Sequence, residues 1–484
     1  MNCVDYFFEN TRTFQKNLVI GIPESLTYQT IYERSNCLAS FLNSKVGTGK
    51  NILLVSQNST FFIVTYLAIL KSGNVCIPLN HGIEQSNFDY ILNKTKSEIG
   101  FISELASKKL EIPVEFYSEN DLPLIYSKSY INGYTNEFDG NRLGEIIFTS
   151  GSTAEPKGVM LTHNNIIANT NSIIQYLNLR ENDRIMVVLP FFYCYGLSLL
   201  HTHIRVGGQL VLNNNFIFLA STINKLNEFQ CTGFAGVPSH FQILLRKTEL
   251  FKKTEFPYLR YVTQAGGKLE NAFILEFAES FPSIDFFVMY GQTEATARLS
   301  YLPPHMLKKK LGSLGKGIPG VELKVVNQKG EVVQPGKTGE IIARGNNIMQ
   351  GYFDDPKESL KAIRNGWLYT GDIATIDSDG YIFLTARKKE IMKIGGKRIS
   401  PKEIEAVIYQ IPGIIDCSVK AVADDILGEA IKAIIVVAEN VINVNEETIK
   451  SYCSGKLSNY KIPSVIELKY EISMSATGKK TYQN

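Results

Sequence analysis

The chain has 484 residues, more than one hydrophobic core usually serves, so we expect at least two domains. Its composition is typical of a soluble globular protein, with 44% hydrophobic and 20% charged residues. The 50 lysines and arginines nearly balance the 47 aspartates and glutamates. This balance argues against the concentrated basic face of a nucleic-acid-binding protein, so we expect no nucleic-acid partner.

Cysteine usage and the apolar stretches indicate the compartment. None of the seven cysteines lies in a C-x-x-C pair, which favours reduced thiols. The N-terminal residues (MNCVDYFFEN) lack the basic segment and apolar core of a signal peptide. The most apolar stretch, residues 61–70, is too short to span a bilayer. We therefore expect a cytoplasmic protein with no membrane span.

Strand-like and helix-like segments alternate through about the first 380 residues. Thr27 is placed to cap a helix, residues 51–56 (NILLVS) resemble a buried strand, and residues 61–71 resemble a helix ended by Gly73. Residues 75–78 resemble the next strand. The pattern predicts an α/β fold whose large N-terminal domain has mostly parallel sheets flanked by helices.

A second region begins near residue 387. Ser400-Pro401-Lys402-Glu403 has the form of a capping box with proline at the first helical position, and Pro412-Gly413 would end that helix. Strand-like runs at 417–422 and 430–437 precede a helix expected over about 446–457. The sequence thus predicts a large domain, residues 1–386, and a small α+β C-terminal domain, residues 387–484.

The segment that follows the apolar residues 146–148 has the parts needed to hold phosphate oxygens. It offers hydroxyl groups, glycine amides and one mobile cation. These residues are Thr149, Ser150, Gly151, Ser152, Thr153 and Lys157. It is not a Walker A loop. Pro156 stands where that motif has a glycine before the lysine, and Gly158 stands where it has serine or threonine after the lysine. A polar surface turn is the alternative interpretation.

This segment resembles the phosphate-loop signature of the acyl-adenylate-forming superfamily, which includes acyl-CoA synthetases, the adenylation domains of peptide synthetases, and luciferases. Further segments resemble the motifs of this superfamily in the right order, over nearly the whole chain. They are residues 67–73, Ala265-Gly266-Gly267, Tyr290-Gly291-Gln292-Thr293-Glu294, Tyr369-Thr370-Gly371-Asp372, residues 387–396 and Gly478-Lys479. The resemblance implies ATP-dependent activation of a carboxylic acid to acyl-AMP with release of pyrophosphate, then transfer to a thiol.

The resemblance also implies roles in nucleotide binding. Gly266 and Gly267 would lie beside the adenine, on which Tyr290 would stack, and Asp372 and Arg387 would hold the ribose. The phosphate loop and the segment Gly291, Gln292 and Thr293 would contact the phosphates. Thr149 and Glu294 would contact Mg²⁺, which prefers hard oxygen ligands. Outside these motifs, each such residue would be an ordinary turn, packing or surface residue.

Catalysis requires positive charge where pyrophosphate leaves. The resemblance implies that Lys479 reaches the substrate carboxylate and the α-phosphate, assisted by Thr293 and Lys157. Ser473 and Met474 depart from the usual upstream proline and basic residue, and Lys480 is a neighbouring alternative to Lys479.

Between the two chemical steps the small domain is expected to turn, because one site must first surround ATP and then admit a thiol. The resemblance implies that Lys389 is the hinge of this lid domain, and that Gly395 and Gly396 line the thiol tunnel. A charged exposed linker would account for Lys389 equally well.

The acyl pocket is expected around residues 190–196 (PFFYCYG). The resemblance places Phe192, Tyr193, Val237 and Gly267 against the acyl group, although core packing explains the aromatic residues equally well. Amino-acid-activating domains have an aspartate where Tyr193 stands. An α-ammonium would therefore remain unpaired here, which favours an acid without an α-amine.

The expected acceptor is coenzyme A, with the phosphopantetheine of an acyl carrier protein acting in trans as the alternative. The alternative from a different class of function, one without catalysis, is a catalytically silent nucleotide-binding subunit. His201 and His203 lack cysteine or carboxylate partners at ligand spacing, so we predict no metal site there.

Overall fold

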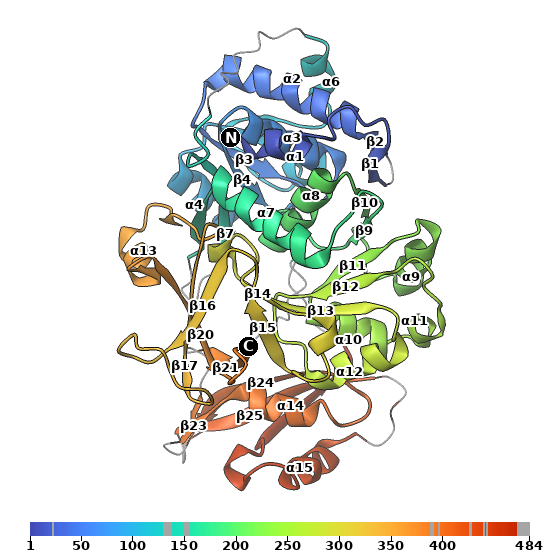
Figure 1. Cartoon of the computed structure of the whole chain (residues 1–484), viewed down its shortest axis with the longest axis vertical. Coiled ribbons are helices and arrows are strands. Elements are labelled where there is room, and N and C mark those ends of the chain that lie inside the picture. The colour runs from blue at the N-terminus through green and yellow to red at the C-terminus, as the bar shows by residue number, and fades with distance from the viewer. Residues whose placement is uncertain are drawn as a thin grey trace.

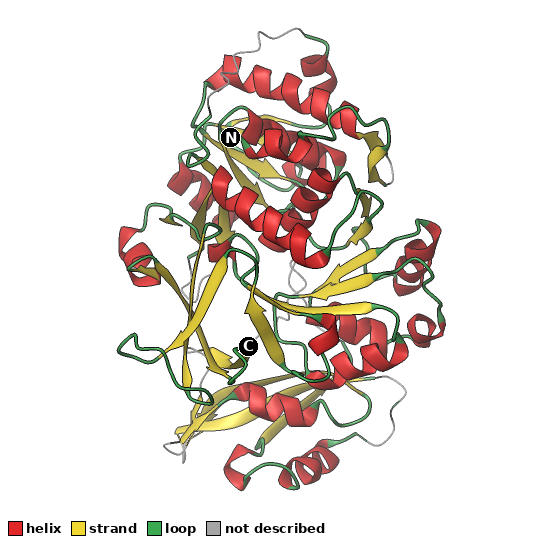
Figure 2. Cartoon of the chain, viewed as in Figure 1, coloured by secondary structure: helices red, strands yellow, loops and turns green. Residues whose placement is uncertain are grey.

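The computed structural model describes residues 1–21, 24–128, 138–149, 155–387, 392–394, 397–424, 428–438, 441 and 444–471. Within these residues, two large β-sheets hold a layer of helices between them, and a small α+β unit lies at the opposite end from the N-terminal sheet (Figure 1). Figure 2 shows that helices also cover the outer faces. The predicted α/β class is therefore confirmed.

The first sheet contains the two strands that flank the expected phosphate loop, β7 and β8. Its strands run in the order β18 (Gly351–Tyr352), β8 (Lys157–Thr162), β7 (Leu143–Thr149), β4 (Val75–Leu79), β3 (Asn51–Val55), β5 (Ile99–Ile102) and β6 (Glu115–Tyr117). The strands from β7 to β6 are parallel, whereas β8 and β18 are antiparallel to their neighbours.

The second sheet has a parallel half and an antiparallel half. The parallel half runs β1 (Asn17–Ile20), β10 (Gln209–Leu212), β9 (Arg184–Val187), β11 (Gly233–Gly236), β12 (Tyr261–Gln264) and β13 (Asp285–Tyr290), with β2 (Leu26–Thr27) antiparallel at its edge. The antiparallel half continues through β14 (Ser300–Leu302), β15 (Ser313–Gly317), β21 (Ile382–Arg387), β20 (Trp367–Ile376), β17 (Thr338–Gly345) and β16 (Val321–Val326), and β19 (Ile363–Arg364) pairs with β20.

Four helices form the layer between the sheets. They are α1 (Cys3–Phe8), α3 (Thr60–Lys71), α7 (His163–Leu177) and α8 (Cys194–Val206). Helix α3 packs on β3 and β4, and α8 packs on β9 and β10. Helix α1 contacts both of them, and α7 contacts α1 and α8. One apolar cluster therefore joins strand residues of both sheets through these helices.

The remaining helices lie outside this layer or connect strands. In the N-terminal part these are α2 (Tyr28–Val46), α4 (Gln85–Thr95), α5 (Glu104–Ser107) and α6 (Leu122–Tyr126). Further along the chain they are α9 (Leu219–Glu228), α10 (Pro238–Arg246), α11 (Glu249–Lys253), α12 (Asn271–Ser280), α13 (Pro356–Ala362) and the short 3₁₀ turns η1 (Thr293–Ala295) and η2 (Pro304–Met306).

The buried strands explain why the sheets are covered on both faces. In β3, Ile52 and Leu54 belong to the central apolar cluster, whereas Leu53 and Val55 pack with Phe88 of α4 on the other face. Successive side chains point to opposite faces of a strand, so a continuous apolar run needs a partner layer on each side.

Two helix signals in the N-terminal part are confirmed. The side chain of Thr27 caps α2 by accepting a 3.1 Å hydrogen bond from the Thr30 amide. Helix α3 ends at Lys71, and Gly73 follows with a φ of +73°. Residues 61–70 are all buried, as expected for a helix that is apolar on every side. Across the described ranges, no helix combines the length and apolar character needed to cross a bilayer.

The small C-terminal unit contains β22 (Met392–Ile394), β23 (Lys397–Ile399), α14 (Pro401–Ile408), β24 (Ile414–Asp424), β25 (Gly428–Val437), α15 (Glu446–Ser454), η3 (Asn459–Lys461) and β26 (Val465–Lys469). Strands β24, β25 and β26 form a separate sheet. The predicted capping box is wrong, because the hydroxyl of Ser400 donates to the Thr385 carbonyl and Glu403 pairs with Lys461.

This unit packs on α10 and α12 of the large domain. The rings of Phe273 and Tyr409 lie 5.5 Å apart at 77°, and Arg246 Nη1 donates a 3.4 Å hydrogen bond to the Ile414 carbonyl. The expected boundary between residues 386 and 387 would fall at the end of β21, and it stays a prediction.

Candidate active site

Strands β7 and β8 hold the two ends of the expected phosphate loop next to each other. Thr149 and Lys157 are antiparallel partners, and Thr149 Oγ1 donates a 3.4 Å hydrogen bond to the Lys157 carbonyl. The loop residues Ser150, Gly151, Ser152 and Thr153 lie outside the described residues. The strand pairing thus places one hydroxyl and one ammonium group at the base of that loop.

The ammonium group of Lys157 has two neighbours from the segment after β17. It forms an ion pair with Glu358 of α13, and it lies 5.3 Å from the centre of the Tyr352 ring. Lys361 also pairs with Glu358, at 2.6 Å. Lys157 and then Lys361 lower the pKa of Glu358 to about 2, so this carboxylate is ionised at neutral pH.

Tyr352 also contacts the predicted metal ligand Glu294. Its hydroxyl donates a 2.8 Å hydrogen bond to Glu294 Oε1. Burial, and next the charge of Glu294, raise the pKa of Tyr352, which therefore keeps its proton. Tyr352 is positioned because β18 pairs with β8, with Tyr352 opposite Val159. A single tyrosine thus connects the expected phosphate cation with the expected Mg²⁺ ligand.

The predicted adenine and ribose residues lie together. The hydroxyl of Tyr290, at the end of β13, donates a 2.7 Å hydrogen bond to Asp372 Oδ2 in β20, 82 residues away. Asp372 is 3% exposed, and its amide donates a 3.2 Å hydrogen bond to Thr370 Oγ1. The backbone of Arg387 pairs opposite Asp372, although the side chain of Arg387 lies outside the described part of the chain.

The segment after Tyr290 fits tightly into the fold. A Cβ atom on Gly291 would lie 2.0 Å from the Ala297 carbonyl oxygen, so only glycine is accommodated there. Gln292 precedes the 3₁₀ turn that carries Thr293 and Glu294. Thr293 is 3% exposed, and its hydroxyl lies 3.5 Å from Cys194 Sγ. This contact joins the nucleotide motif to the expected acyl-pocket stretch.

The glycine pair after β12 lies against the start of α10. Gly266 has a φ of +85°, and a Cβ atom there would lie 3.1 Å from Cγ1 of buried Val237. The carbonyl of Gly267 accepts a 2.7 Å hydrogen bond from Gln264 Nε2. Gly266 of the expected adenine loop and Val237 of the expected acyl pocket are therefore neighbours.

Phe192 and Tyr193 lie directly before α8 and are half-buried. Tyr193 packs at the margin of the central apolar cluster. The contact of the next residue, Cys194, with Thr293 places this stretch beside the nucleotide motif. Their contact with an acid stays a prediction. Four further predicted residues, Lys389, Gly395, Gly396 and Lys479, lie outside the described residues.

Sequence reasoning missed three residues at this site: Tyr352, Glu358 and Arg298. Tyr352 and Glu358 reach Lys157 because a strand about 190 positions further along the chain pairs with β8, and no local pattern signals that pairing. Arg298 follows Glu294 by four residues, and its burial, at 3% exposure, was the signal that only the structure supplies.

The two histidines of α8 have separate partners. His201 Nε2 lies 2.8 Å from the Tyr66 hydroxyl, whereas His203 Nδ1 lies 2.9 Å from the Leu199 carbonyl oxygen. Burial lowers the pKa of His201 to about 3, so its ring is neutral at physiological pH. Among the described residues, no three His, Cys, Asp or Glu side chains are grouped closely enough to bind a metal ion by themselves.

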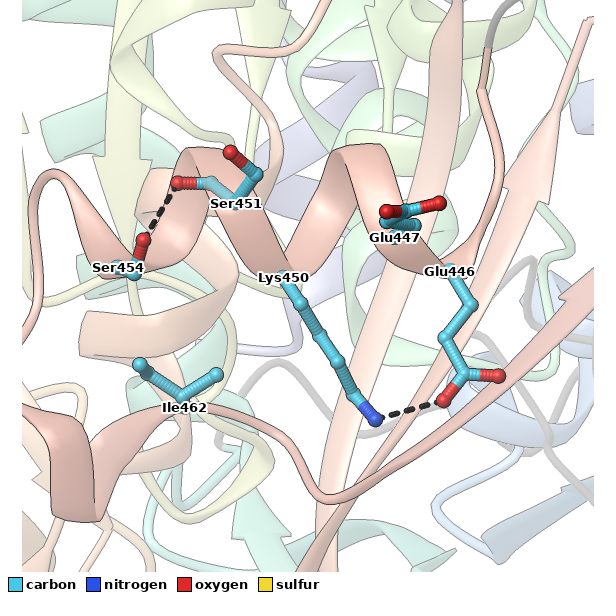
Figure 3. Close-up of a pocket in the computed structure, with 6 residues that line it drawn as sticks. All are labelled: Glu446, Glu447, Lys450, Ser451, Ser454 and Ile462. Carbon is cyan, nitrogen blue, oxygen red and sulfur yellow. Dashed lines mark hydrogen bonds and ion pairs between the residues drawn. The ribbon is translucent and has the colours of Figure 1, made fainter.

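A surface hollow lies on α15, away from these motifs (Figure 3). It is lined by Glu446, Glu447, Lys450, Ser451, Ser454 and Ile462. Its ionic groups partly satisfy one another, because Lys450 pairs with Glu446 at 2.6 Å. The hollow contains none of the predicted site residues.

Comparison with known proteins agrees with this arrangement. Residues 7–353 match the family model "AMP-binding enzyme", and residues 403–479 match the model "AMP-binding enzyme C-terminal domain". An oxalate–CoA ligase of Arabidopsis thaliana is 30% identical, over 94% of this chain and 92% of its own length. A medium-chain fatty-acid–CoA ligase of Escherichia coli (strain K12) is 28% identical, over 98% and 88% of the two chains.

Solved structures share the fold. The anthranilate CoA ligase AuaEII, in complex with anthranoyl-AMP, has a TM-score of 0.90 at 22% identity and covers 99% of this chain and 95% of its own. ATP-bound MatB from Rhodopseudomonas palustris has a TM-score of 0.87 at 22% identity, covering 99% and 97%. The motif order, the converging residues and the family models together lead to one conclusion. This chain belongs to the AMP-binding enzyme family, and the predicted acyl-adenylate-forming superfamily is confirmed.

Proposed function

We propose that this AMP-forming acid–thiol ligase activates a carboxylic acid without an α-amine as its acyl-AMP and transfers the acyl group to coenzyme A. The hydrogen bond between Tyr290 and Asp372 carries the proposal, because it brings the adenine and ribose motifs to one place beside Thr293 and Glu294. The relatives named as CoA ligases support coenzyme A as the acceptor.

Binding of ATP follows from the residues around this hydrogen bond. The face of Tyr290 stacks on the adenine, and the Asp372 carboxylate accepts hydrogen bonds from the ribose hydroxyls. Lys157 neutralises phosphate charge from the base of the phosphate loop, where Thr149 lies opposite it. Arg387 assists at the ribose.

The donor set fits Mg²⁺, because the Thr149 hydroxyl and the Glu294 carboxylate are hard oxygen ligands. Mg²⁺ when bound supplies positive charge that offsets the charge developing on the phosphates. Tyr352 fixes the orientation of Glu294 through its 2.8 Å hydrogen bond. Thr293 holds the α-phosphate in place for attack by the substrate carboxylate.

The acid would lie between the stretch before α8 and the glycine pair after β12. Phe192, Tyr193, Val237 and Gly267 then form its walls. No carboxylate stands at Tyr193, so an α-ammonium group would remain unpaired there, which is costly when buried. After adenylation the small domain, with Lys389 as its hinge, turns so that the thiol reaches the acyl-AMP past Gly395 and Gly396.

Two assays test the proposal in sequence. Acid-dependent ATP–pyrophosphate exchange over a panel of fatty, aryl and hydroxy acids should detect adenylation, with α-amino acids inactive. Thioester formation should then appear with coenzyme A. Thioester formation only on a phosphopantetheinylated carrier protein would replace coenzyme A as the acceptor. Binding of ATP without exchange on any acid would favour a silent nucleotide-binding subunit and reject the proposal.

A further inference from the structure

Arg298 is a buried cation beside the nucleotide motif. It is 3% exposed, and its backbone lies directly against Gly291, where a Cβ atom would meet the Arg298 Cα at 2.8 Å. Its carbonyl oxygen accepts hydrogen bonds from Asn169 Nδ2 at 3.2 Å and Asn347 Nδ2 at 2.8 Å. The backbone of Arg298 is therefore fixed, and its side chain points into protein rather than into solvent.

The guanidinium group lies against the expected acyl pocket. Its central carbon is 3.9 Å from the ring centre of Tyr195, the sixth residue of the PFFYCYG stretch. The Tyr195 hydroxyl lies 2.8 Å from Thr263 Oγ1 in β12, three residues before Gly266. Arg298 thus lies against the first turn of α8, at a tyrosine whose hydroxyl contacts the strand that leads to the glycine pair.

Within the described part of the chain, the partners of the Arg298 side chain are neutral groups. Among the described residues, Nη1 donates a 3.1 Å hydrogen bond to the Ala297 carbonyl, Nε is buried without a partner, and no carboxylate forms an ion pair with the group. Burial raises the pKa of Tyr176 and Tyr195, and the charge of Arg298 and side-chain hydrogen bonding with it offset part of that rise. These tyrosines remain protonated, so they supply no negative charge.

A buried cation without a counter-ion is costly, and guanidinium has five N–H donors arranged to bind a carboxylate through two parallel hydrogen bonds. We propose that Arg298 determines specificity by binding a second carboxylate of the substrate, so that the preferred acid is a dicarboxylic acid activated at its other end. The inference rests on the proposed function, and it names the class of acid that this site takes.

The reacting carboxylate and the phosphates are the other anions near this site. If Arg298 bound either of them, its loss would affect every acid equally. If Arg298 binds a second carboxylate, its loss affects dicarboxylic acids alone. The two cases therefore separate when each diacid is compared with its own monomethyl ester, which keeps the chain length and removes one charge.

ATP–pyrophosphate exchange with the full-length protein measures the preference for each diacid over its monomethyl ester. For the wild type, the best linear dicarboxylic acid should have a kcat/KM at least about 100-fold above that of its monomethyl ester, because a buried polar site rejects an analogue that leaves it unpaired. Arg298→Met should remove this difference, mainly through KM for the diacid. Arg298→Lys should keep part of it, since lysine retains the charge but not the planar fork. Arg344→Met, on the exposed end of β17, is the matched control and should change nothing.

Equal kcat/KM values for diacid and ester in the wild type would overturn the inference, and so would an equal loss for both in Arg298→Met. If Arg298→Met fails to fold, the comparison of each diacid with its monomethyl ester in the wild type and in Arg298→Lys still tests the inference. Exchange with no acid at all would instead reject the proposed function, and exchange with monocarboxylic acids alone would reject only the inference.

Discussion

The hydroxyl of Tyr290 donates a 2.7 Å hydrogen bond to Oδ2 of Asp372. The two residues come from β13 and β20, which are separated in the second sheet by β14, β15 and β21. The bond therefore links the parallel half of that sheet with its antiparallel half, and it orients the Asp372 carboxylate. The expected adenine and ribose residues are thus held to each other across the sheet.

Tyr290→Phe tests this link, because it keeps the flat ring and removes the donor. We expect KM for ATP to rise about tenfold with a smaller change in kcat, since a hydrogen bond to a charged group contributes about 1.5–3 kcal/mol. Initial rates of pyrophosphate exchange at varied ATP measure the effect. An unchanged KM for ATP would show that the hydrogen bond does not support nucleotide binding.

Glu358→Gln tests whether the ion pair with Lys157 competes with ATP phosphates. Removing the negative charge should release Lys157 for the triphosphate and lower KM for ATP by up to about fivefold, because partly exposed ion pairs contribute about 1 kcal/mol or less. Lys361→Met is the matched control, since Lys361 is exposed and pairs with the other oxygen of the Glu358 carboxylate. A higher KM for ATP in Glu358→Gln would mean that Glu358 positions Lys157 instead.

The hydrogen bond between Tyr352 and Glu294 predicts a change in metal dependence. Tyr352→Phe should raise the Mg²⁺ concentration for half-maximal exchange by about tenfold, the usual range for residues that orient a metal ligand. Glu294→Gln should raise it at least as much. The titration is made at fixed total ATP. If kcat falls in both variants while the Mg²⁺ midpoint stays constant, Glu294 is not a metal ligand.

Glu145 predicts a pH dependence of stability. It is buried in β7, accepts a 2.8 Å hydrogen bond from Tyr66, and has a pKa raised by burial from 4.5 to about 7. A raised folded-state pKa contributes stability that is complete below about pH 4.5 and is lost as pH rises through about 7. The loss amounts to about 3 kcal/mol at about 1.4 kcal/mol per pKa unit.

Glu145→Gln should remove this loss, because the amide stays neutral. The variant should melt at a higher temperature than the wild type above about pH 7, and the difference should shrink towards about pH 5. Tyr66 and His201 stay uncharged over this range and do not disturb the comparison. A melting-temperature difference that is independent of pH would contradict the assignment.

Lys479→Ala should lower the rate of adenylation by about 100-fold or more, because a cation aimed at the developing phosphate charge is a large catalytic contribution. Transfer from a chemically supplied acyl-AMP to the thiol should be retained. Lys480→Ala is the matched control, and it should behave like the wild type. If Lys480→Ala is the inactive variant, the catalytic lysine is the neighbour.

Local signals in the sequence predicted much of the fold. The Thr27 cap, the strand at β3 and the apolar helix α3 depend on side chains within a few positions, so they were visible without the structure. The capping box at Ser400 failed because its hydroxyl found a long-range acceptor, the Thr385 carbonyl. Such a competing partner has no local signature.

The candidate site shows the same difference between residues with local sequence signals and residues that depend on long-range contacts. Tyr290, Glu294 and Asp372 stand in compact motifs, so the resemblance could assign them expected roles, which stay predictions. Tyr352 depends on the pairing of β18 with β8, a contact between distant segments that no local spacing encodes. In the sequence, nothing distinguishes Arg298 from a charged surface residue. Only its burial in the folded structure makes it a candidate for a functional role.

Thr149 and Lys157 stand directly opposite each other in the antiparallel pair of β7 and β8. Side chains that are directly opposite in such a pair project from the same face of the sheet, so the Thr149 hydroxyl and the Lys157 ammonium group leave the sheet on one side. A slip of β8 by one residue against β7 would send the ammonium group to the opposite face and separate the two groups. The register of this strand pair therefore decides whether a hydroxyl and a cation face the same space.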